Sequence, residues 1–230
     1  AGVQGSSSRS HTRTDGDDAA GRRTLERDSD NHNTERSATA SGKASLPLGE
    51  AHTLALGWDL ERRSRTEQRR IVQNGADLLA GYEGQPFDAT IVRMAAFAQD
   101  EWQIGPRWGA QIGLRVEELR TTATGLGAEV QHRSQVVSPV LHLTHKLEAA
   151  GRDLLRASLT RSYKAPELNQ LSNRPSINTL YPVDGPNVQI GPDSVGNPAL
   201  RPELATGLDL AFEHYLPQGG VLSIGGFHRH

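Results

Sequence analysis

Apolar and polar residues alternate along eight stretches of this chain, which is the pattern of β-strands whose two faces meet different surroundings. Within residues 52–61 the even positions are mostly apolar and the odd ones are small or polar; the even positions are His52, Leu54, Leu56, Trp58 and Leu60. The alternation predicts strands at about 26–45, 51–66, 89–104, 107–122, 133–147, 153–163, 204–216 and 221–230. In the strand at 89–104, Phe97 and Trp102 have opposite parity, which leaves its apolar face unassigned.

The connections between these strands alternate between short and long. The short ones each contain glycine, which supplies the positive φ of a tight hairpin: 47–50, 105–106, 148–151 and 218–220. The long ones are about 67–88, 123–132 and 164–203. Barrels of bacterial outer membranes have tight periplasmic turns and long extracellular loops. The pattern therefore predicts an all-β fold, an antiparallel meander of about eight strands that forms part of a transmembrane β-barrel.

Several predicted strands have more than the roughly 9–11 tilted residues that cross a bilayer, so we expect them to continue into an extracellular rim. Residues 1–24, rich in Ser, Gly, Arg and Asp, predict a surface loop or a cut end. Residues 25–230 hold the barrel segment, with its long external loop at 164–203. The chain opens at Ala1 without a signal peptide and stops at His230 in mid-strand, so we expect a piece of a longer polypeptide.

Composition excludes several classes of protein. Mean hydropathy is −0.56 and no 18-residue apolar run occurs, so transmembrane helices are excluded. The chain has no cysteine, hence no disulfide framework. A net charge of −2 argues against a nucleic-acid partner. The aromatic content of 5% is low for a barrel expected to carry two aromatic girdles.

Candidate chemistry is sparse. His142 and His145 are three residues apart, which puts them on opposite faces of a strand, and 15–18 lacks the ligand spacing of a calcium loop. No catalytic motif occurs, so the sequence predicts neither an enzyme nor a bound cofactor or metal. The arginine-rich run 61–70 lacks interleaved aromatics, and at the expected outer rim it suits lipopolysaccharide phosphates or plain solvation.

The loop at 164–203 is the candidate ligand-binding region. A structureless connection of this length is uncommon in compact domains and usually has a function. Its amide, aromatic and charged side chains suit a polar or anionic small molecule, such as an iron chelate; the candidate ligand-binding residues are Lys164, Arg174, Tyr181 and Asp184. The alternative interpretation is a loop that only caps the barrel mouth.

Three motifs resemble one family. Residues 155–168 read LRASLTRSYKAPEL, residues 196–203 read GNPALRPE, and FAQDEW at 97–102 is followed by GLRVE at 113–117. In this order they resemble the barrel of TonB-dependent outer-membrane receptors. Pro198 and Pro202 stiffen the end of the loop, so we interpret the second motif as structural.

The resemblance implies a 22-strand barrel with an N-terminal plug, and TonB-energised uptake of a scarce ligand such as an iron-siderophore. Its partners would be outer-membrane lipid, lipopolysaccharide and the TonB complex. The sequence departs from the family in having no plug, no TonB box and only about eight strands, so contact with TonB is expected through a plug region missing from it. A passive or secretory barrel, or a surface adhesin sheet, is the alternative function.

Overall fold

The computed structural model describes residues 1–148, 152–178 and 191–230, and they form antiparallel β-structure with one short helix. In chain order the elements are β1 (Gly2–Asp17), β2 (Arg23–Leu48), β3 (His52–Gln73), β4 (Ala76–Asp77), β5 (Pro86–Ile104), β6 (Trp108–Gly125), β7 (Ala128–Lys146), β8 (Asp153–Lys164), α1 (Leu168–Leu171), β9 (Pro175–Ser176), β10 (Ser194–Val195), β11 (Glu203–Tyr215) and β12 (Val221–Arg229).

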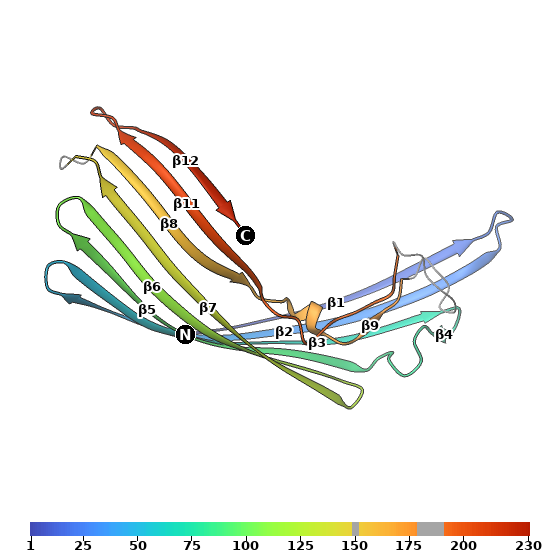
Figure 1. Ribbon diagram of the computed structural model, residues 1–230. Helices are drawn as coiled ribbons and strands as arrows, with labels where there is room; N and C mark the ends of the chain where they lie inside the picture. Colours follow the sequence, from blue (N-terminus) through green and yellow to red (C-terminus); the bar gives the residue numbers. More distant parts are fainter. Residues whose placement is uncertain (149–151, 179–190) are drawn as a thin grey trace.

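The long strands form one curved sheet in the order β1-β2-β3-β5-β6-β7-β8-β11-β12 (Figure 1). Short β4 pairs with β3, and β9 and β10 form a separate two-stranded ladder. Neighbouring strands are antiparallel throughout this path, as the meander prediction requires. Within the described residues β1 and β12 do not pair, so the sheet is an open part of a barrel.

The prediction of a surface loop over residues 1–24 is wrong for most of that segment. Gly2–Asp17 forms β1 and pairs along its length with β2, and only the residues between the two strands form a turn. Both faces of this hairpin carry polar side chains, and nearly all of β1 is exposed. Without an apolar face the sequence has no alternation to detect, although backbone pairing alone continues the ladder.

Two predicted long connections are also shorter than expected, because their strands continue. β6 and β7 extend to Gly125 and Ala128, and only Leu126 and Gly127 turn the chain, with φ of 52° and 75°. β3 continues to Gln73, well into the predicted connection 67–88. Polar residues on both faces of these extensions hide the strand period. The third long connection, between β8 and β11, is present at 165–202.

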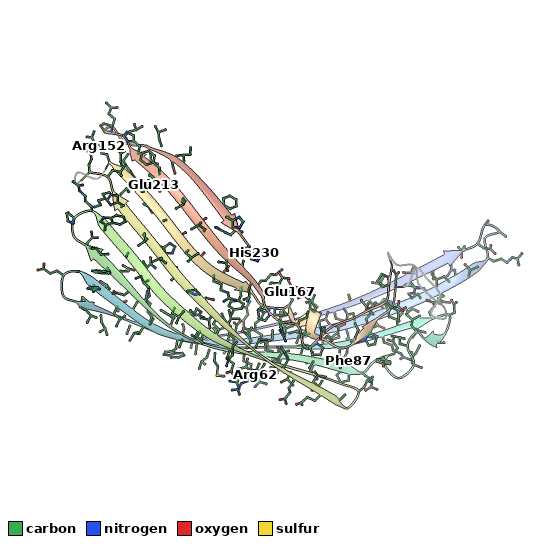
Figure 2. All side chains as sticks on the ribbon, in the orientation of Figure 1. Arg62, Phe87, Arg152, Glu167, Glu213 and His230 are labelled. Atoms are coloured by element: carbon green, nitrogen blue, oxygen red, sulfur yellow. The ribbon has the colours of Figure 1, made fainter. Side chains whose placement is uncertain are left out.

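The sheet has an apolar outer face and a polar inner face. Leu56, Trp58 and Leu60 are 42–46% exposed on the convex outer side. They pair with Ala98, Ala96 and Met94 of β5, which therefore share that face. Figure 2 shows Arg62 on the convex side and Glu167 on the concave side. The alternation predicted for β3 is thus confirmed.

The register also assigns the ambiguous strand β5. Phe97 pairs with Gly57 on the inner face, where a Cβ added to Gly57 would lie 2.4 Å from the Phe97 ring. An aromatic ring covering a glycine of the neighbouring strand is a known way to fill a sheet surface. Trp102 instead faces outward and stacks on His52, with ring centroids 5.2 Å apart. Trp108 joins it at the short-turn edge, packed against His145 with ring centroids 4.0 Å apart.

The apolar cluster lies on the inner face, beneath the connection between β8 and β11. Leu168 and Leu171 of α1 pack with Ala89 and Ile91 of β5, and Leu200 covers them. Figure 1 shows α1 above the concave side of the sheet. The connection thus folds back onto the wall. No helix among the described residues is long and apolar enough to cross a membrane.

Candidate binding site under the long connection

The described parts of the 165–202 connection are held by backbone contacts at close range. The Asn197 N–H donates to the Gln170 carbonyl at 2.7 Å, which ties the end of the connection to α1. A Cβ added to Gly196 would lie 1.9 Å from the Ser172 carbonyl oxygen, so only glycine allows this approach. The Ala199 N–H donates to the Asn197 Oδ1 at 2.9 Å. These contacts support the structural interpretation of the 196–203 motif.

A buried ion pair links this connection to the segment after β4. The side chains of Arg174 and Glu83 are 4% and 2% exposed, and Arg174 Nη2 lies 3.4 Å from Glu83 Oε2. Arg174 Nη2 also donates to the Arg69 carbonyl at 3.1 Å, and Glu83 accepts the Ile71 N–H at 2.7 Å. Burial lowers the pKa of Arg174, and the Glu83 carboxylate opposes that shift. The guanidinium remains charged, because arginine pKa values start far above neutrality.

The four residues predicted to bind ligand have different positions. Arg174 is buried at the wall, as described. Lys164 is the last residue of β8, exposed and in register with Glu203. Tyr181 and Asp184 lie outside the described residues.

A polar pocket of about 280 Å³ lies between the inner face of β3 and this connection. β3 contributes Arg65, Glu67 and Arg69; the connection contributes Asn169, Ser172 and Arg174, and the short β9 and β10 strands complete the lining. Sequence reasoning missed Arg65, Arg69 and Ser172. Extending the strand prediction past residue 66 would have placed the odd residues of β3 together on the inner face.

The arginine-rich run therefore does not lie at the outer rim as one surface. Strand alternation divides it between two faces: Arg62 points outward, whereas Arg65 and Arg69 line the inner pocket. The predicted place at the outer rim is wrong for Arg65 and Arg69, because β3 continues through the run as a strand and places them in the inner pocket.

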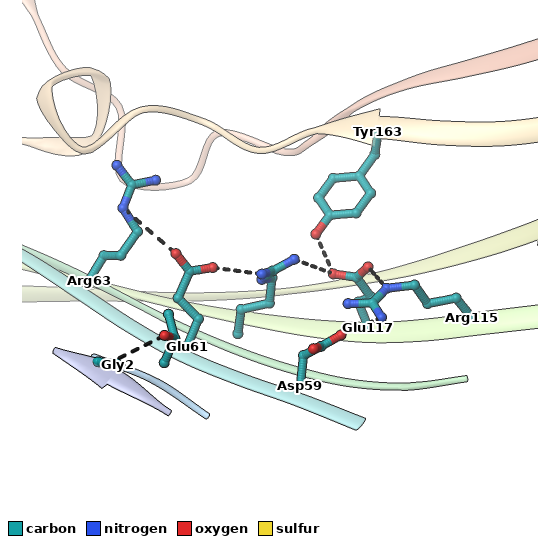
Figure 3. Close-up of polar contacts among 9 residues, drawn as sticks. Gly2, Asp59, Glu61, Arg63, Arg115, Glu117 and Tyr163 are labelled. Atoms are coloured by element: carbon teal, nitrogen blue, oxygen red, sulfur yellow. Dashed lines mark hydrogen bonds and ion pairs between the residues drawn. The ribbon is translucent and has the colours of Figure 1, made fainter. Parts of the chain in front are cut away.

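A network of charged side chains on the inner face of the sheet anchors the end of β8, where the 165–202 connection begins (Figure 3). Glu117 of β6 is 3% exposed and receives hydrogen bonds from Tyr163, Arg115 and Arg93, the last at 3.4 Å. Arg93 also lies 2.8 Å from Glu61 of β3. Tyr163 is the penultimate residue of β8, so its hydroxyl joins the start of the connection to β6, two strands away in the sheet.

Tyr163→Phe is expected to lower the stability of the β8 end by about 1–2 kcal/mol, because a hydrogen bond to a buried carboxylate is lost. Hydrogen exchange at the end of β8 measures the change. Tyr215→Phe is the matched control: its hydroxyl donates to Glu213 at 3.0 Å, but this pair is exposed and its loss should have little effect. Equal protection in both variants would exclude an anchoring role for Tyr163.

Within residues 1–148, 152–178 and 191–230, no group of three or more His, Asp or Glu side chains is arranged to hold a metal ion. His142 and His145 lie on opposite faces, as predicted: His142 lines inner-face pockets, whereas His145 packs on the outer Trp108.

Comparison with known proteins identifies the family. The family model described as "TonB dependent receptor-like, beta-barrel" matches residues 2–230. No curated protein sequence matches this chain. Among solved structures, the unliganded ferric citrate transporter FecA matches with a TM-score of 0.59 at 15% identity, over 99% of this chain and 31% of that one.

Two further structures agree in fold. The copper transporter OprC has a TM-score of 0.56 at 15% identity, over 93% of this chain and 33% of its own. The alcaligin outer-membrane receptor FauA of Bordetella pertussis has a TM-score of 0.51 at 15% identity, over 99% of this chain and 33% of its own. The chain thus spans about a third of the length of these structures. Its strand order, its inward-folded connection and its match over residues 2–230 lead to one conclusion: the chain belongs to the β-barrel of the TonB-dependent receptors.

Proposed function

We propose that this chain is the wall and part of the extracellular recognition surface of a receptor that takes up a scarce ligand, such as an iron-siderophore, across the outer membrane of a Gram-negative bacterium. The family is one of transport receptors, and structural neighbours are named as transporters or receptors of ferric citrate, alcaligin and copper. In the intact receptor, TonB would drive release of the ligand through a plug inside the barrel, as the family implies.

The observation that carries this proposal is the inward fold of the 165–202 connection. A loop that only capped the barrel mouth would need no anchor on the wall, yet α1 is buried against β5 and Arg174 is buried against Glu83. This anchoring holds polar groups above the lumen, where a ligand entering from outside would meet them. We propose Lys164, Arg174, Tyr181 and Asp184, together with the pocket lined by Arg65 and Arg69, as the contact region.

The outer face supports a place in the outer membrane. Toward the edge of the sheet that carries the 165–202 connection, three arginines follow the apolar residues of this face. They form a cross-strand row in which Arg62 pairs with Val92, Val92 with Arg120, and Arg120 with Arg133. Glu118 pairs with both Arg120 and Arg133 of this row. Arginine binds phosphate well, and we propose that this row contacts lipopolysaccharide phosphates above a belt of lipid. Recovery of the full-length protein in the soluble periplasm would contradict this location.

Uptake by whole cells tests the transport function. Cells lacking the full-length receptor should lose uptake of one class of radiolabelled ferric chelate from a hydroxamate, catecholate and carboxylate panel. The intact gene should restore that uptake, but only where TonB is functional. Unchanged uptake of every chelate, or restored uptake without TonB, would contradict the proposal for this panel.

A further inference from the structure

We infer that the pocket between β3 and the 165–202 connection binds an oxyanion, either a carboxylate or a phosphate group of the ligand. This inference rests on the proposed function, since it names the chemical class of the group that the receptor would recognise. The geometry points to a built site, because the pocket joins the inner face of a strand to a connection far along the chain. Arg69 and Arg174, which both line it, are 105 residues apart in the sequence.

The charge around the pocket is arranged for an anion. Three guanidinium groups line it, from Arg65, Arg69 and Arg174, against the single carboxylate of Glu67. Outside the lining, Glu35 pairs with Arg65 at 2.6 Å, and Glu83 pairs with Arg174 at 3.4 Å. Across the described chain, no carboxylate lies within ion-pair distance of Arg69. Within the described structure its positive charge therefore has no ion-pair partner, and a bound anion would supply one.

Unpartnered donors in the lining reinforce this interpretation. The Ser172 Oγ, the Arg174 Nε and the Arg65 Nε are buried atoms without a hydrogen-bond partner among the described residues. The Ser172 and Arg174 residues are each only 7% exposed. Leaving such a group unpaired costs about 1–3 kcal/mol, and more where it is charged. An oxyanion would accept from these hydroxyl and guanidinium N–H donors, whereas no group among the described residues does.

The proximity of like charges agrees with an anion site. Burial is the main cause of the lowered pKa of Arg174, and the positive charge of Arg69 lowers it further. A bound anion would relieve that repulsion, and guanidinium groups offer paired N–H donors that match a carboxylate or a phosphate. A volume of about 280 Å³ accommodates the charged end of a ligand and leaves the rest of it outside.

The experiment measures anion binding to the purified full-length receptor in detergent, by calorimetric titration with citrate and, separately, inorganic phosphate. Arg69→Gln is expected to weaken binding about ten-fold, because a charge-assisted hydrogen bond is lost. Ser172→Ala is expected to weaken it about three-fold and to leave stability equal or higher, since the hydroxyl has no partner in the described protein. Loss of affinity in Ser172→Ala would therefore not come from unfolding.

Arg63→Gln is the matched control. Arg63 is on the same face of β3 but does not line the pocket, so its removal should leave anion binding unchanged. Citrate binding alone identifies a carboxylate site, phosphate binding alone a phosphate site, and both support a general oxyanion site. Binding of neither anion, or equal binding by wild type, Arg69→Gln and Ser172→Ala, would overturn the inference. A receptor that binds anions without mediating uptake would overturn only the proposed transport.

Discussion

Replacing Leu171 with aspartate is expected to detach the 165–202 connection from the wall and to abolish most ligand uptake, while the barrel stays folded. Leu171 is 0% exposed, in a cluster with Ala89 and Ile91, so the variant loses its apolar contacts and buries an unpaired charge. Truncating a buried leucine alone costs about 2–5 kcal/mol, and 2 kcal/mol already lowers the equilibrium constant for docking by roughly 30-fold. The strands lose no backbone hydrogen bond.

Three measurements check this expectation: hydrogen exchange over the described residues of the connection, migration of the unheated full-length protein on a gel, and uptake of its ligand. Ala199→Asp is the control, because this exposed position of the same connection introduces the same charge without removing a buried contact. The two variants should differ in exchange and uptake but not in migration. Normal uptake by a Leu171→Asp receptor with a detached connection would remove the docked state from the binding mechanism.

Ile112→Arg is expected to destabilise the intact barrel in lipid vesicles by about 2–4 kcal/mol, the cost of an arginine near the bilayer midplane. Ile112 is 52% exposed on the outer face of β6, which we assign to lipid. Its neighbour Gln111 lines two pockets on the inner face, away from lipid, so Gln111→Arg should cost far less. Urea unfolding of the two refolded variants gives the comparison. Equal losses of stability would mean that the outer face does not meet lipid.

The predictable part of the fold was the part that has one apolar face. In β3, alternation identified the strand and its outward residues, and register now pairs Leu56 with Ala98 and Ala98 with Leu114 on that face. Glycine identified several tight turns, including Gly49 and Gly105, whose φ values are 74° and 62°. Where both faces are polar, as in β1 and the extensions of β6 and β7, the alternation gives no signal. The sequence therefore did not predict β1 or these extensions.

The candidate site was predictable only as a region. The length and polarity of the 164–203 loop indicated a recognition surface, but among its residues only the tertiary structure distinguishes Arg174, buried against Glu83, from Lys164, exposed at a strand end. Nothing in the local sequence around Arg174 predicts that its partner is Glu83, a residue 91 positions earlier in the chain. Burial of a charge depends on contacts between distant segments, which a local pattern does not contain.

By itself, then, the sequence determined the all-β meander, eight of its strands and the outward face of some of them, such as β3, because a period of two is a local property of a strand with one apolar side. Only the tertiary structure decided the facing of β5, through Phe97 covering Gly57, and the docking of α1 on Ala89 and Ile91. It also brought Arg65 and Arg69 against Ser172 and Arg174. These outcomes depend on cross-strand register and on the return of a long connection, which are set by the free energy of the whole sheet.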